Sequence, residues 1–563
     1  MNITFNDDTP QMQRLKKLKI KSEERLVKTF AKSAGVKYVD LSLKSINTDA
    51  LKLIPEVRSR EAHMVVFDMK DRDLDIAVRS TLPQKTQEEI QKLKDKKYNI
   101  TIYMASARSI DKAWSRYGDI SYAVVTERGV IDLSSADIQD VLEQVKTLED
   151  AKIILSEAIN SNKSYRISKI IELFLYAAYA LGASDIHIET SEDGARVRFR
   201  MDGILTEVAN FDMQTFGRIL NRIKLTAGLK ISIKENSQDG RFTIRLADLE
   251  LEIRTSTLPD AYGESVVMRL LDPKAISVPM EKLGFLPYFQ DIVTREIDKP
   301  NGMVINTGPT GSGKSTTLFA LLRKLIKPEN KILTIENPIE YHVKGITQSQ
   351  VNIEKGFTFL SGLRAALRQD PDIIMVGEIR DGETASIAVN AALTGHLVFS
   401  TLHTNSAAGA FPRFMELGVN PKILATAMNM IIAQRLVRKL CPFCKVQVNA
   451  ADEKNTKQME NIVKIYSGIE NKERFIDTSV EHKIFKAVGC EKCNGTGFKG
   501  RIAVVEGVIM DEKLEILLAS EPTEREIVAN TRHQGILSLK QDAVIKIVSG
   551  MTSYDEVLRV VEL

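Results

Sequence analysis

The sequence predicts an α/β protein of several domains, and three observations support this prediction. From about residue 303 onward, short apolar runs alternate with helical patterns, as in a mostly parallel sheet. One of these runs leads into a glycine-rich loop that opens an amphipathic helix. The chain has 563 residues, of which 43% are hydrophobic, so it is too long for one core and has apolar residues for several. We therefore expect three or four domains.

Charge and hydropathy narrow the class of protein. The chain has 78 basic and 74 acidic residues and a formal net charge of +4, a balance that does not call for a nucleic-acid partner, although residues 14–21 are locally basic. The longest nearly apolar stretch, residues 171–183, contains Glu172 and is too short to cross a bilayer, and residues 1–20 lack an apolar signal-peptide core. We expect a cytoplasmic protein that contacts the membrane only peripherally.

The chain is expected to divide into six segments. They are a basic tail at 1–25, an α/β segment at 26–150, an α+β domain at 151–285, the parallel-sheet core at 286–435, a cysteine-bearing segment at 436–505 and a helical segment at 506–563. The α+β prediction rests on a helix at 167–180, a strand at 185–189, a hairpin that turns at Asp202-Gly203, and strands at 249–256 and 265–271. The first 150 residues, with a strand expected at 38–41 and a helix at 84–96, show no catalytic pattern.

The strongest chemical signal is a phosphate-binding loop. It fits G-x-x-x-x-G-K-[ST], it follows the apolar run 303–305, and leucines at helical spacing follow it. Its glycines let backbone N–H groups surround phosphate oxygens, its lysine supplies positive charge to the β- and γ-phosphates, and its serine hydroxyl ligates Mg²⁺. ATP and Mg²⁺ are therefore the predicted cofactors, held by Gly308, Pro309, Thr310, Gly311, Ser312, Gly313, Lys314, Ser315 and Thr316.

Two further strand ends are acidic. Glu378 emerges after the apolar run 373–376, at the end of the strand where open α/β sheets place their chemistry, so it is the candidate general base or water-orienting group. Gly377 stands where such a strand usually carries an acidic residue, so Mg²⁺ is expected to use Ser315 and another carboxylate. Glu336, at the end of the run 332–335, is the expected supplier. An exposed loop carboxylate is the plainer alternative for Glu378.

Two histidines, His396 and His403, flank the predicted strand 397–401. A lone histidine is more often structural than functional, and this spacing alone decides nothing. Because several strand ends of one predicted sheet carry polar residues, we interpret the two histidines as sensors of the γ-phosphate.

The four cysteines form two C-x-x-C pairs separated by 45 residues, Cys441 with Cys444 and Cys490 with Cys493. Each pair can form a tight knuckle with two thiolates, and two knuckles complete a closed tetrahedral Zn²⁺ site. Redox chemistry would need only one pair beside a strand and helix, and unliganded structural thiols are the other alternative. We predict a structural zinc site with no open coordination position.

Taken together, these motifs resemble a known family. Residues 308–315, 334–340, 368–381 and 394–403 are similar to the Walker A, Asp box, Walker B and His box of the type II/type IV secretion ATPase superfamily. Residues 182–189 and the four cysteines narrow the resemblance to the assembly ATPases, the type IV pilus extension motors and their type II secretion counterparts. The resemblance covers about residues 155–563, and the first 150 residues match loosely, as an N-terminal docking domain would.

The resemblance implies a fold and a set of partners. It implies a RecA-like P-loop ATPase domain, a preceding α+β (PAS-like) domain, an N-terminal α/β docking domain and a tetracysteine zinc subdomain. It further implies a homohexamer that works at the inner membrane on a platform protein to assemble a pilus or pseudopilus. The N-terminal domain would bind a cytoplasmic, membrane-associated assembly protein, and no nucleic acid is expected.

The resemblance also assigns arginines. Arg254 and Arg269 correspond to the arginine fingers that the α+β domain presents to the nucleotide, and Arg364 and Arg368 are secondary candidates. The chain departs from the family pattern at Asn337, where an aspartate is usual. It also lacks the Arg-Leu-Gly motif by which some N-terminal domains of the family bind cyclic di-GMP, so that ligand is not predicted.

Three alternatives remain open at this point. A pilus retraction motor shares the ATPase boxes but is usually shorter and lacks the N-terminal extension and the four cysteines. A nucleic-acid motor of the conjugation or DNA-uptake type predicts hydrolysis that nucleic acid stimulates with a steep salt dependence. A nucleotide-gated scaffold would bind ATP without turnover.

Overall fold

The computed structural model describes residues 10–44, 46–51, 53–70, 72–80, 83–119, 129–132, 145–160, 167–246, 249–272, 278–448, 453–476 and 483–563. The chain forms two compact units, Met1–Met201 with Leu205–Leu270, and Asp202–Ile204 with Leu271–Leu563. Each unit is described by itself. Residues 1–9 of the predicted basic tail lie outside the described residues, and helix α1, Pro10–Ser33, runs across the predicted boundary at residue 25.

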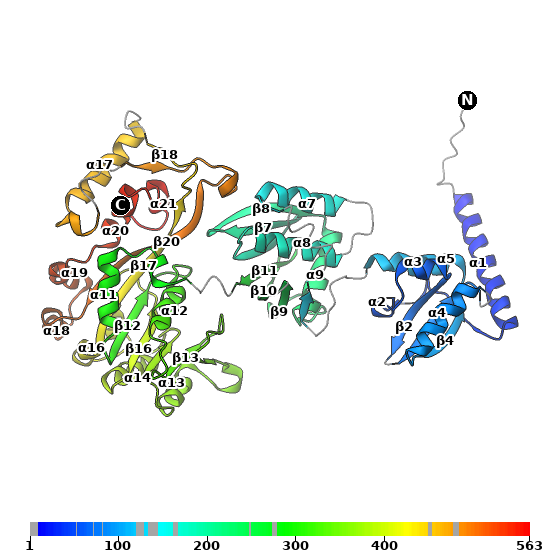
Figure 1. The fold of residues 1–563 in the computed structure, drawn as a ribbon, viewed down its shortest axis with the longest axis horizontal. Coiled ribbons are helices and arrows are strands. Elements are labelled where there is room, and N and C mark those ends of the chain that lie inside the picture. The colour runs from blue at the N-terminus through cyan, green and yellow to red at the C-terminus, as the bar shows by residue number, and fades with distance from the viewer. Residues whose placement is uncertain are drawn as a thin grey trace. The chain divides into compact units, whose positions relative to one another are not determined.

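The first unit begins with a four-stranded sheet in the order β1-β4-β3-β2 (Figure 1). Neighbouring residues of β2 face opposite sides, so Val65 and Phe67 join one apolar cluster and Met64 and Val66 the other. Helices cover both faces, which explains why this strand is apolar along four consecutive residues. The elements are β1 (Lys37–Tyr38), α2 (Thr48–Leu51), α3 (Glu56–Glu61), β2 (Met64–Lys70), β3 (Asp73–Val78), α4 (Gln84–Asp95), β4 (Asn99–Met104) and α5 (Ala107–Ser115).

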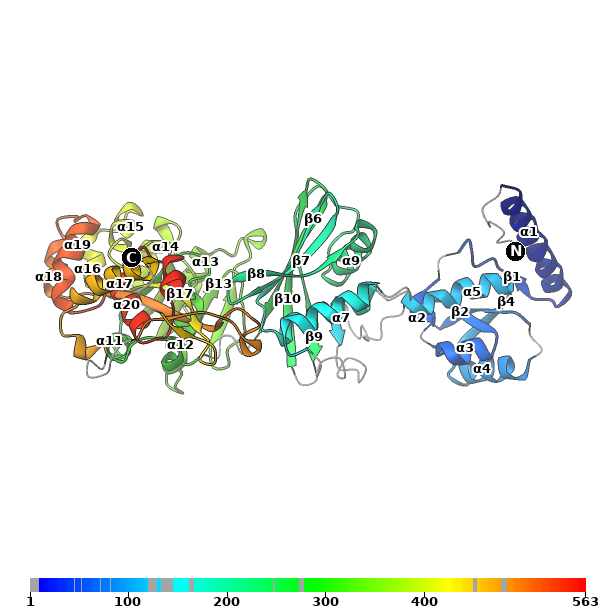
Figure 2. The same cartoon turned by 90° about the horizontal axis from the view of Figure 1, so that it is seen from above.

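The first unit also contains a seven-stranded sheet in the order β5-β9-β10-β11-β6-β7-β8. Apolar and charged residues alternate along its strands, so one face packs on helix α8 through residues such as Phe174 and Ile253, and the other face is charged. Figure 2 shows the strands of this sheet with helices α7 and α9. This confirms the α+β prediction; the PAS-like detail stays a prediction. The elements are β5 (Val130–Asp132), α7 (Leu148–Asn160), α8 (Ile167–Ala180), β6 (Asp185–Ser191), β7 (Gly194–Met201), β8 (Ile204–Phe211), α9 (Met213–Thr226), β9 (Gln238–Leu246), β10 (Leu249–Asp260) and β11 (Gly263–Leu271).

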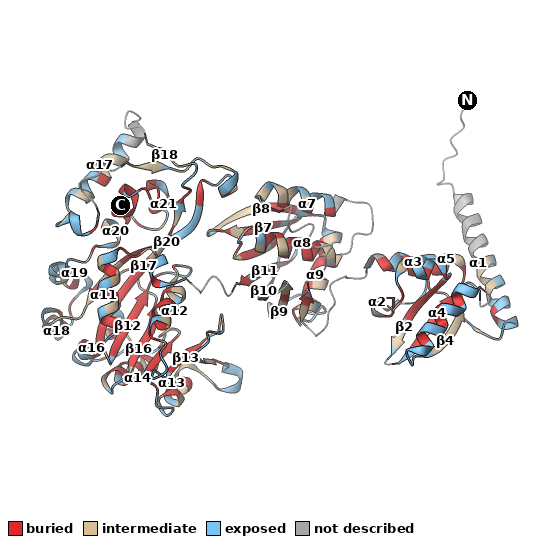
Figure 3. Ribbon diagram, in the orientation of Figure 1, coloured by how far each residue is buried: buried red, intermediate tan, exposed pale blue. Residues whose placement is uncertain are grey.

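The second unit is built on another seven-stranded sheet, in the order β14-β13-β15-β16-β12-β17-β20. All neighbouring pairs are parallel except β17 with β20, which confirms the predicted mostly parallel sheet. Helices pack on both faces, so strands such as β12 and β16 are buried along their whole length (Figure 3). The elements are α11 (Pro287–Ile297), β12 (Gly302–Thr307), α12 (Lys314–Lys324), β13 (Ile332–Glu336), β14 (Thr347–Gln350), α13 (Phe359–Leu367), β15 (Ile373–Val376), α14 (Gly382–Leu393), β16 (Leu397–Leu402), α15 (Ala410–Glu416), α16 (Pro421–Ala427) and β17 (Met428–Leu440).

The C-terminal part of the second unit is mostly helical after β20. Side chains of Asp511, Thr523, Ser538 and Ser553 cap the N-termini of four successive helices by accepting a backbone N–H three residues on, which fixes where each helix begins. Within the described residues, no helix is long and apolar enough to cross a membrane. The elements are β18 (Val446–Gln447), α17 (Glu453–Ser467), β19 (Phe485–Lys486), β20 (Phe498–Ile509), α18 (Glu512–Leu518), α19 (Glu524–Thr531), α20 (Leu539–Val548) and α21 (Tyr554–Leu558).

Candidate functional site

The predicted phosphate loop lies at the carboxyl edge of the parallel sheet. Strand β12 ends at Thr307 and helix α12 begins at Lys314, so the loop connects a buried strand to a helix N-terminus. Gly308, Gly311 and Gly313 have φ angles of 148°, 79° and 88°, which residues with side chains rarely adopt. The loop is therefore shaped by its glycines in the way that a phosphate cradle requires.

Lys314 folds back along this loop. Its Nζ donates to the carbonyl oxygens of Gly308 and Pro309 at 2.8 and 3.1 Å. Burial lowers the pKa of Lys314, and the nearby Glu378 carboxylate acts in the opposite direction. The next residue, Ser315, is exposed in the first turn of α12, and Thr316 is half-buried. The cation and the hydroxyl predicted to hold phosphate and Mg²⁺ thus occupy the start of one helix.

Gln434, a residue that the sequence analysis missed, braces the loop from strand β17. Its buried side chain accepts hydrogen bonds from Asn306 Nδ2 (3.1 Å) and Thr317 Oγ1 (2.8 Å) and donates to the Ser312 carbonyl (2.9 Å). One amide therefore joins β12, α12, β17 and the loop. The signal that could have found it is an amide side chain directly after the apolar run 430–433, in a stretch that returns to apolar residues at 436–437.

The predicted base Glu378 follows strand β15 and lies next to a guanidinium group and an imidazole. Arg380 Nη2 is 2.7 Å from Glu378 Oε1, and His403 Nε2 is 3.6 Å from Glu378 Oε2. The Glu378 side chain is 15% exposed, so it is not the exposed loop carboxylate that the sequence left open. Burial lowers the pKa of His403, and Lys314 acts in the same direction, which favours the neutral imidazole.

Close packing against strand β13 explains why residue 377 is a glycine. Its backbone N–H donates to the Ile335 carbonyl at 2.8 Å, and a Cβ at this position would lie 3.2 Å from that same oxygen. Thr401 Oγ1 also donates to the Gly377 carbonyl at 2.8 Å. A side chain here would press on strand β13, so the carboxylate that the sequence analysis sought at this position has little room.

Glu336 is buried at the end of β13. Its Oε1 accepts from Thr334 Oγ1 (2.6 Å) and Gln348 Nε2 (2.9 Å), and burial raises its pKa. Both recorded partners belong to β13 and β14, and Ser315 is not among them. The predicted role of Glu336 at Mg²⁺ therefore stays a prediction.

The two histidines lie at opposite ends of strand β16. Strand β16 pairs with β12 so that Leu397 is opposite Gly302 and Leu402 is opposite Thr307. His403 therefore reaches the edge of the phosphate loop, whereas His396 precedes the strand and its Nδ1 contacts the Ala391 carbonyl at 3.0 Å. Six residues of strand span about 20 Å. The structure brings His403 to Glu378 but does not bring His396 there.

The predicted arginine fingers belong to the first unit. Arg254 on β10 and Arg269 on β11 both lie on the sheet face opposite the core. Arg269 Nε donates to Asp185 Oδ1 at 2.9 Å, and Arg254 Nε is 3.7 Å from Glu252 Oε1. In the second unit, Arg364 and Arg368 are exposed on and directly after α13. Their roles at the nucleotide stay predictions.

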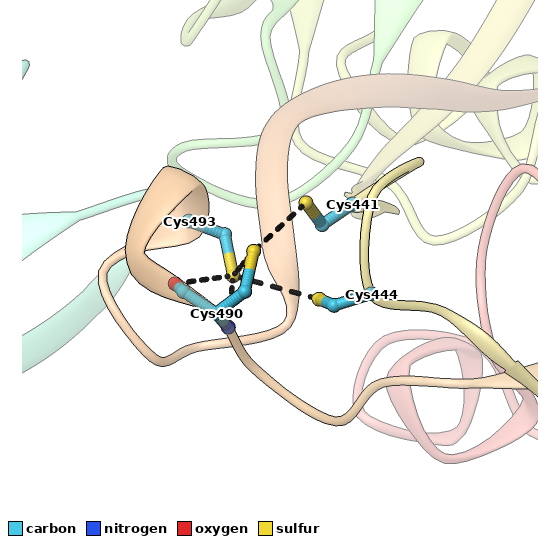
Figure 4. A group of neighbouring side chains, drawn as sticks. All are labelled: Cys441, Cys444, Cys490 and Cys493. Atoms are coloured by element: carbon cyan, nitrogen blue, oxygen red, sulfur yellow. Dashed lines mark hydrogen bonds between the residues drawn. The ribbon is translucent and has the colours of Figure 1, made fainter.

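The four cysteines converge, as Figure 4 shows. Strands β17 and β20 pair antiparallel up to Leu440 and Phe498, so the knuckle that follows one strand meets the knuckle that precedes the other. The Sγ atoms of Cys441 and Cys490 are 3.9 Å apart, and those of Cys444 and Cys493, and of Cys490 and Cys493, are 3.7 Å apart.

These separations fit a metal. Four sulfur atoms on a tetrahedral Zn²⁺ lie roughly 3.8 Å from one another, given the ordinary zinc–sulfur bond length. Burial would raise the pKa of the Cys493 thiol, but hydrogen bonds from the backbone N–H groups of Cys490 and Gly497 and from neighbouring thiols lower that pKa to about 7. Burial and the same neighbouring thiols raise the pKa of Cys444 to about 12, so the first proton of the cluster leaves from Cys493. A thiolate held by N–H donors is the form that binds zinc, so the donor set fits the ion.

Comparison with known proteins agrees with this site. The model of the family described as Type II/IV secretion system protein matches residues 160–559, and the MshEN domain model matches residues 34–121. The type II secretion system ATPase E of Vibrio cholerae is 41% identical over 438 residues, covering 77% of this chain and 84% of that protein.

A second group of relatives consists of pilus assembly ATPases. The type IV pilus assembly ATPase PilB of Myxococcus xanthus is 36% identical over 547 residues, covering 95% of this chain and 91% of that protein. The family model covers well over half of the chain, and the phosphate loop and Glu378 lie inside the matched range. The chain therefore belongs to the type II/IV secretion system protein family, and it is an ATP-hydrolysing enzyme.

Proposed function

We propose that this ATPase works as a cytoplasmic homohexamer that drives assembly of a type IV pilus or a type II secretion pseudopilus through an inner-membrane platform protein. The observation that carries the proposal is the meeting of Lys314, Glu378 and His403 at the carboxyl edge of one parallel sheet. The relatives support the assembly role, because they are named as secretion and pilus assembly ATPases.

The residues of the site divide the hydrolysis reaction among them. Lys314 and the N–H groups of the loop bind the β- and γ-phosphates, and Ser315 is the proposed ligand of Mg²⁺, which would neutralise charge on the phosphate oxygens. Glu378 orients the attacking water and accepts its proton. Arg380 holds one carboxylate oxygen and His403 faces the other, which fixes the direction in which Glu378 points.

Arginines and a second metal complete the proposal. Arg254 and Arg269 act as fingers that neutralise charge on the transferred phosphoryl group, because a planar guanidinium matches the geometry of phosphate oxygens. Cys441, Cys444, Cys490 and Cys493 hold one structural Zn²⁺, which ties the end of β17 to the start of β20.

The four cysteines and the N-terminal domain favour an assembly motor over a retraction motor, which usually has neither. The balanced charge of the chain argues against a nucleic-acid motor. That alternative is tested directly, because it requires that added DNA stimulate hydrolysis and that salt abolish the stimulation.

The first experiment measures steady-state ATP hydrolysis, particle mass with and without ATP and Mg²⁺, and zinc content. The wild type should hydrolyse ATP as a hexamer with one zinc per chain, and Glu378→Gln should still bind ATP and lose at least about 100-fold in turnover, the usual contribution of a general base. Glu354→Gln, in an exposed turn of the same domain, is the matched control and should behave as wild type.

Several outcomes would contradict this proposal. Turnover by a monomer would refute the hexamer. Retained turnover in Glu378→Gln would exclude that residue from the mechanism. Zinc-free protein with normal stability would refute the structural role of zinc. Hydrolysis that appears only with DNA would move the chain to the nucleic-acid class.

The N-terminal domain is the proposed link to the membrane. We expect residues 1–150 to bind a membrane-associated assembly protein and so dock the motor peripherally at the inner membrane. A chain without residues 1–119, which include the four-stranded sheet and not β5, should lose its membrane fraction while keeping its ATPase activity. The phosphate loop and Glu378 lie in the second unit, and the seven-stranded sheet that carries Arg254 and Arg269 stays complete. Normal membrane localisation of the shortened chain would refute the docking role.

A further inference from the structure

Arg435 on strand β17 brings a second cation to the phosphate loop. A Cβ built on Gly308 would lie 2.5 Å from the Gln434 carbonyl oxygen, 2.8 Å from Ser312 Oγ and 3.2 Å from Arg435 Nη1, so the guanidinium lies beside this point of the loop. Arg435 also lies close enough to Lys314 to oppose protonation of that lysine, and it lowers the pKa of Lys314 in the same direction as burial. Two positive groups thus share one side of the site.

The hydrogen bonds of Arg435 do not neutralise its charge. Nη1 donates to the Gln434 carbonyl at 3.1 Å and Nη2 to the Asn405 carbonyl at 2.8 Å, and both acceptors are backbone oxygens. A guanidinium has five N–H donors. In the described part of the chain, the recorded hydrogen bonds use two of its N–H groups, and none of them goes to a carboxylate.

Glu506, an acidic residue that acts on the charge of Arg435, accepts its own hydrogen bonds from backbone N–H groups. Glu506 raises the pKa of Arg435 from a distance, but its Oε1 accepts from the Ala407 N–H at 2.9 Å and its Oε2 from the Leu539 N–H at 3.1 Å. Burial in turn raises the pKa of Glu506. Both carboxylate oxygens therefore serve the backbone around them and do not pair with the guanidinium.

This arrangement costs free energy unless an anion binds. A half-buried cation without a carboxylate partner is unfavourable, and a second cation beside it adds repulsion. Phosphate oxygens at the loop would reverse the sign of both contributions, and a planar guanidinium contacts them well. Resting on the ATPase site described above, we propose that Arg435 is a further phosphate-binding residue, which enters from β17 and contacts the phosphate chain shared by ATP and ADP.

A purely structural role makes a different prediction. If Arg435 only ties the Asn405 carbonyl to β17, its loss would loosen the loop after β16, where Thr404 is held by Thr307 through a 2.8 Å hydroxyl contact. Such a loss would weaken all adenine nucleotides to the same extent. A phosphate contact instead weakens ligands according to the number of phosphates they carry.

Calorimetric titration of Arg435→Gln with ADP and AMP separates these roles. We expect the Kd for ADP to rise between about 10-fold and 100-fold, the range for a charge-assisted hydrogen bond, and the Kd for AMP to rise much less. Arg435→Lys should recover part of the ADP affinity because it keeps the charge. Arg413→Gln, an exposed arginine paired with Glu416 on α15, is the matched control and should leave both affinities unchanged.

Equal weakening of ADP and AMP, or an ADP affinity within about twofold of wild type in a folded variant, would overturn the proposal. A second measurement does not depend on a variant: phenylglyoxal labelling of wild-type arginines, read by mass spectrometry, should show that ADP protects Arg435 and not Arg413. Equal labelling of Arg435 with and without ADP would overturn the proposal, whereas a wild type that binds no ADP would refute the ATPase site itself.

Discussion

The two seven-stranded sheets use charged residues in opposite ways. Along the mostly antiparallel sheet of the first unit, charged and apolar residues alternate, and the charges pair across strands, as Arg245 does with Glu250 and Arg269 with Asp185. In the mostly parallel sheet of the second unit, strands β12, β15 and β16 are buried along their whole length and carry no charged residue, and Lys314, Glu378 and His403 stand beyond the ends of these strands.

This difference follows from burial. A sheet with one covered face has room for charges at every second position, and each finds a neighbour on the next strand. A sheet covered on both faces has no such positions, so its polar groups collect at the edge where Lys314, Glu378 and His403 meet. At that edge Glu378 pairs with Arg380, whereas the hydrogen bonds of Lys314 among the described residues go to backbone carbonyls, which leaves its charge for a ligand.

The largest effect expected from this comparison belongs to Lys314→Ala. Removal of the ammonium group should weaken ATP binding by at least about 100-fold, because the phosphates lose a charge-assisted contact. The variant should melt no lower than wild type, since burial lowers the pKa of Lys314 and so already disfavours the charge in the folded protein. Titration with ATP and a melting curve measure the two quantities.

Lys324→Ala is the matched control on the same helix. Lys324 is exposed in the last turn of α12, and its Nζ donates to Thr294 Oγ1 at 2.7 Å. The Lys324→Ala variant should bind ATP as wild type does. A Lys314→Ala variant that binds ATP normally would mean that the edge of the parallel sheet is not where the phosphates lie.

The contrast between the sheets also explains what the sequence could predict. Strand β15 was predicted to the residue because four buried apolar residues stand between polar ones. Strand β14, Thr347–Gln350, is an entirely polar edge strand and gives no such signal. The cysteine cluster was predicted from spacing, but the pairing of β17 with β20 that joins its halves depends on residues far apart in the chain.

The site was predictable where the chemistry follows from local sequence. The phosphate loop carries its own signature, and Glu378 follows a readable strand. Gln434 and Arg435 were missed because their importance comes from contacts with Ser312 and Gly308, more than 120 residues away. From the sequence, we interpret His396 and His403 together as sensors of the γ-phosphate. They stand before and after strand β16, so the length of that strand separates them.

A second variant tests the opposite side of the comparison, where charge serves the fold. Lys224 and Glu264 in the first unit are 1% and 3% exposed; Lys224 Nζ donates to Glu264 Oε1 at 2.5 Å and to the Ile233 carbonyl at 2.8 Å. Lys224→Met leaves a buried carboxylate without its partner, which should cost about 3–5 kcal/mol. Hydrogen exchange read by mass spectrometry should then speed up in β9, β10 and β11 and stay unchanged in β12 and β16.

Two companion variants show how much of the cost of Lys224→Met comes from the burial of the ion pair. Replacing both partners, Lys224→Met with Glu264→Leu, should restore most of the protection, because no unpaired charge is left inside. Arg245→Gln breaks a pair of the same sheet whose side chains are 38% and 59% exposed, and it should cost no more than about 1 kcal/mol. If the exposed and the buried pair proved equally costly, pairing alone would decide the energetics of this sheet. A difference of several kcal/mol would instead show that burial makes these charges indispensable to the fold, whereas Lys314 in the second unit, whose hydrogen bonds go to backbone carbonyls, stays available to a ligand.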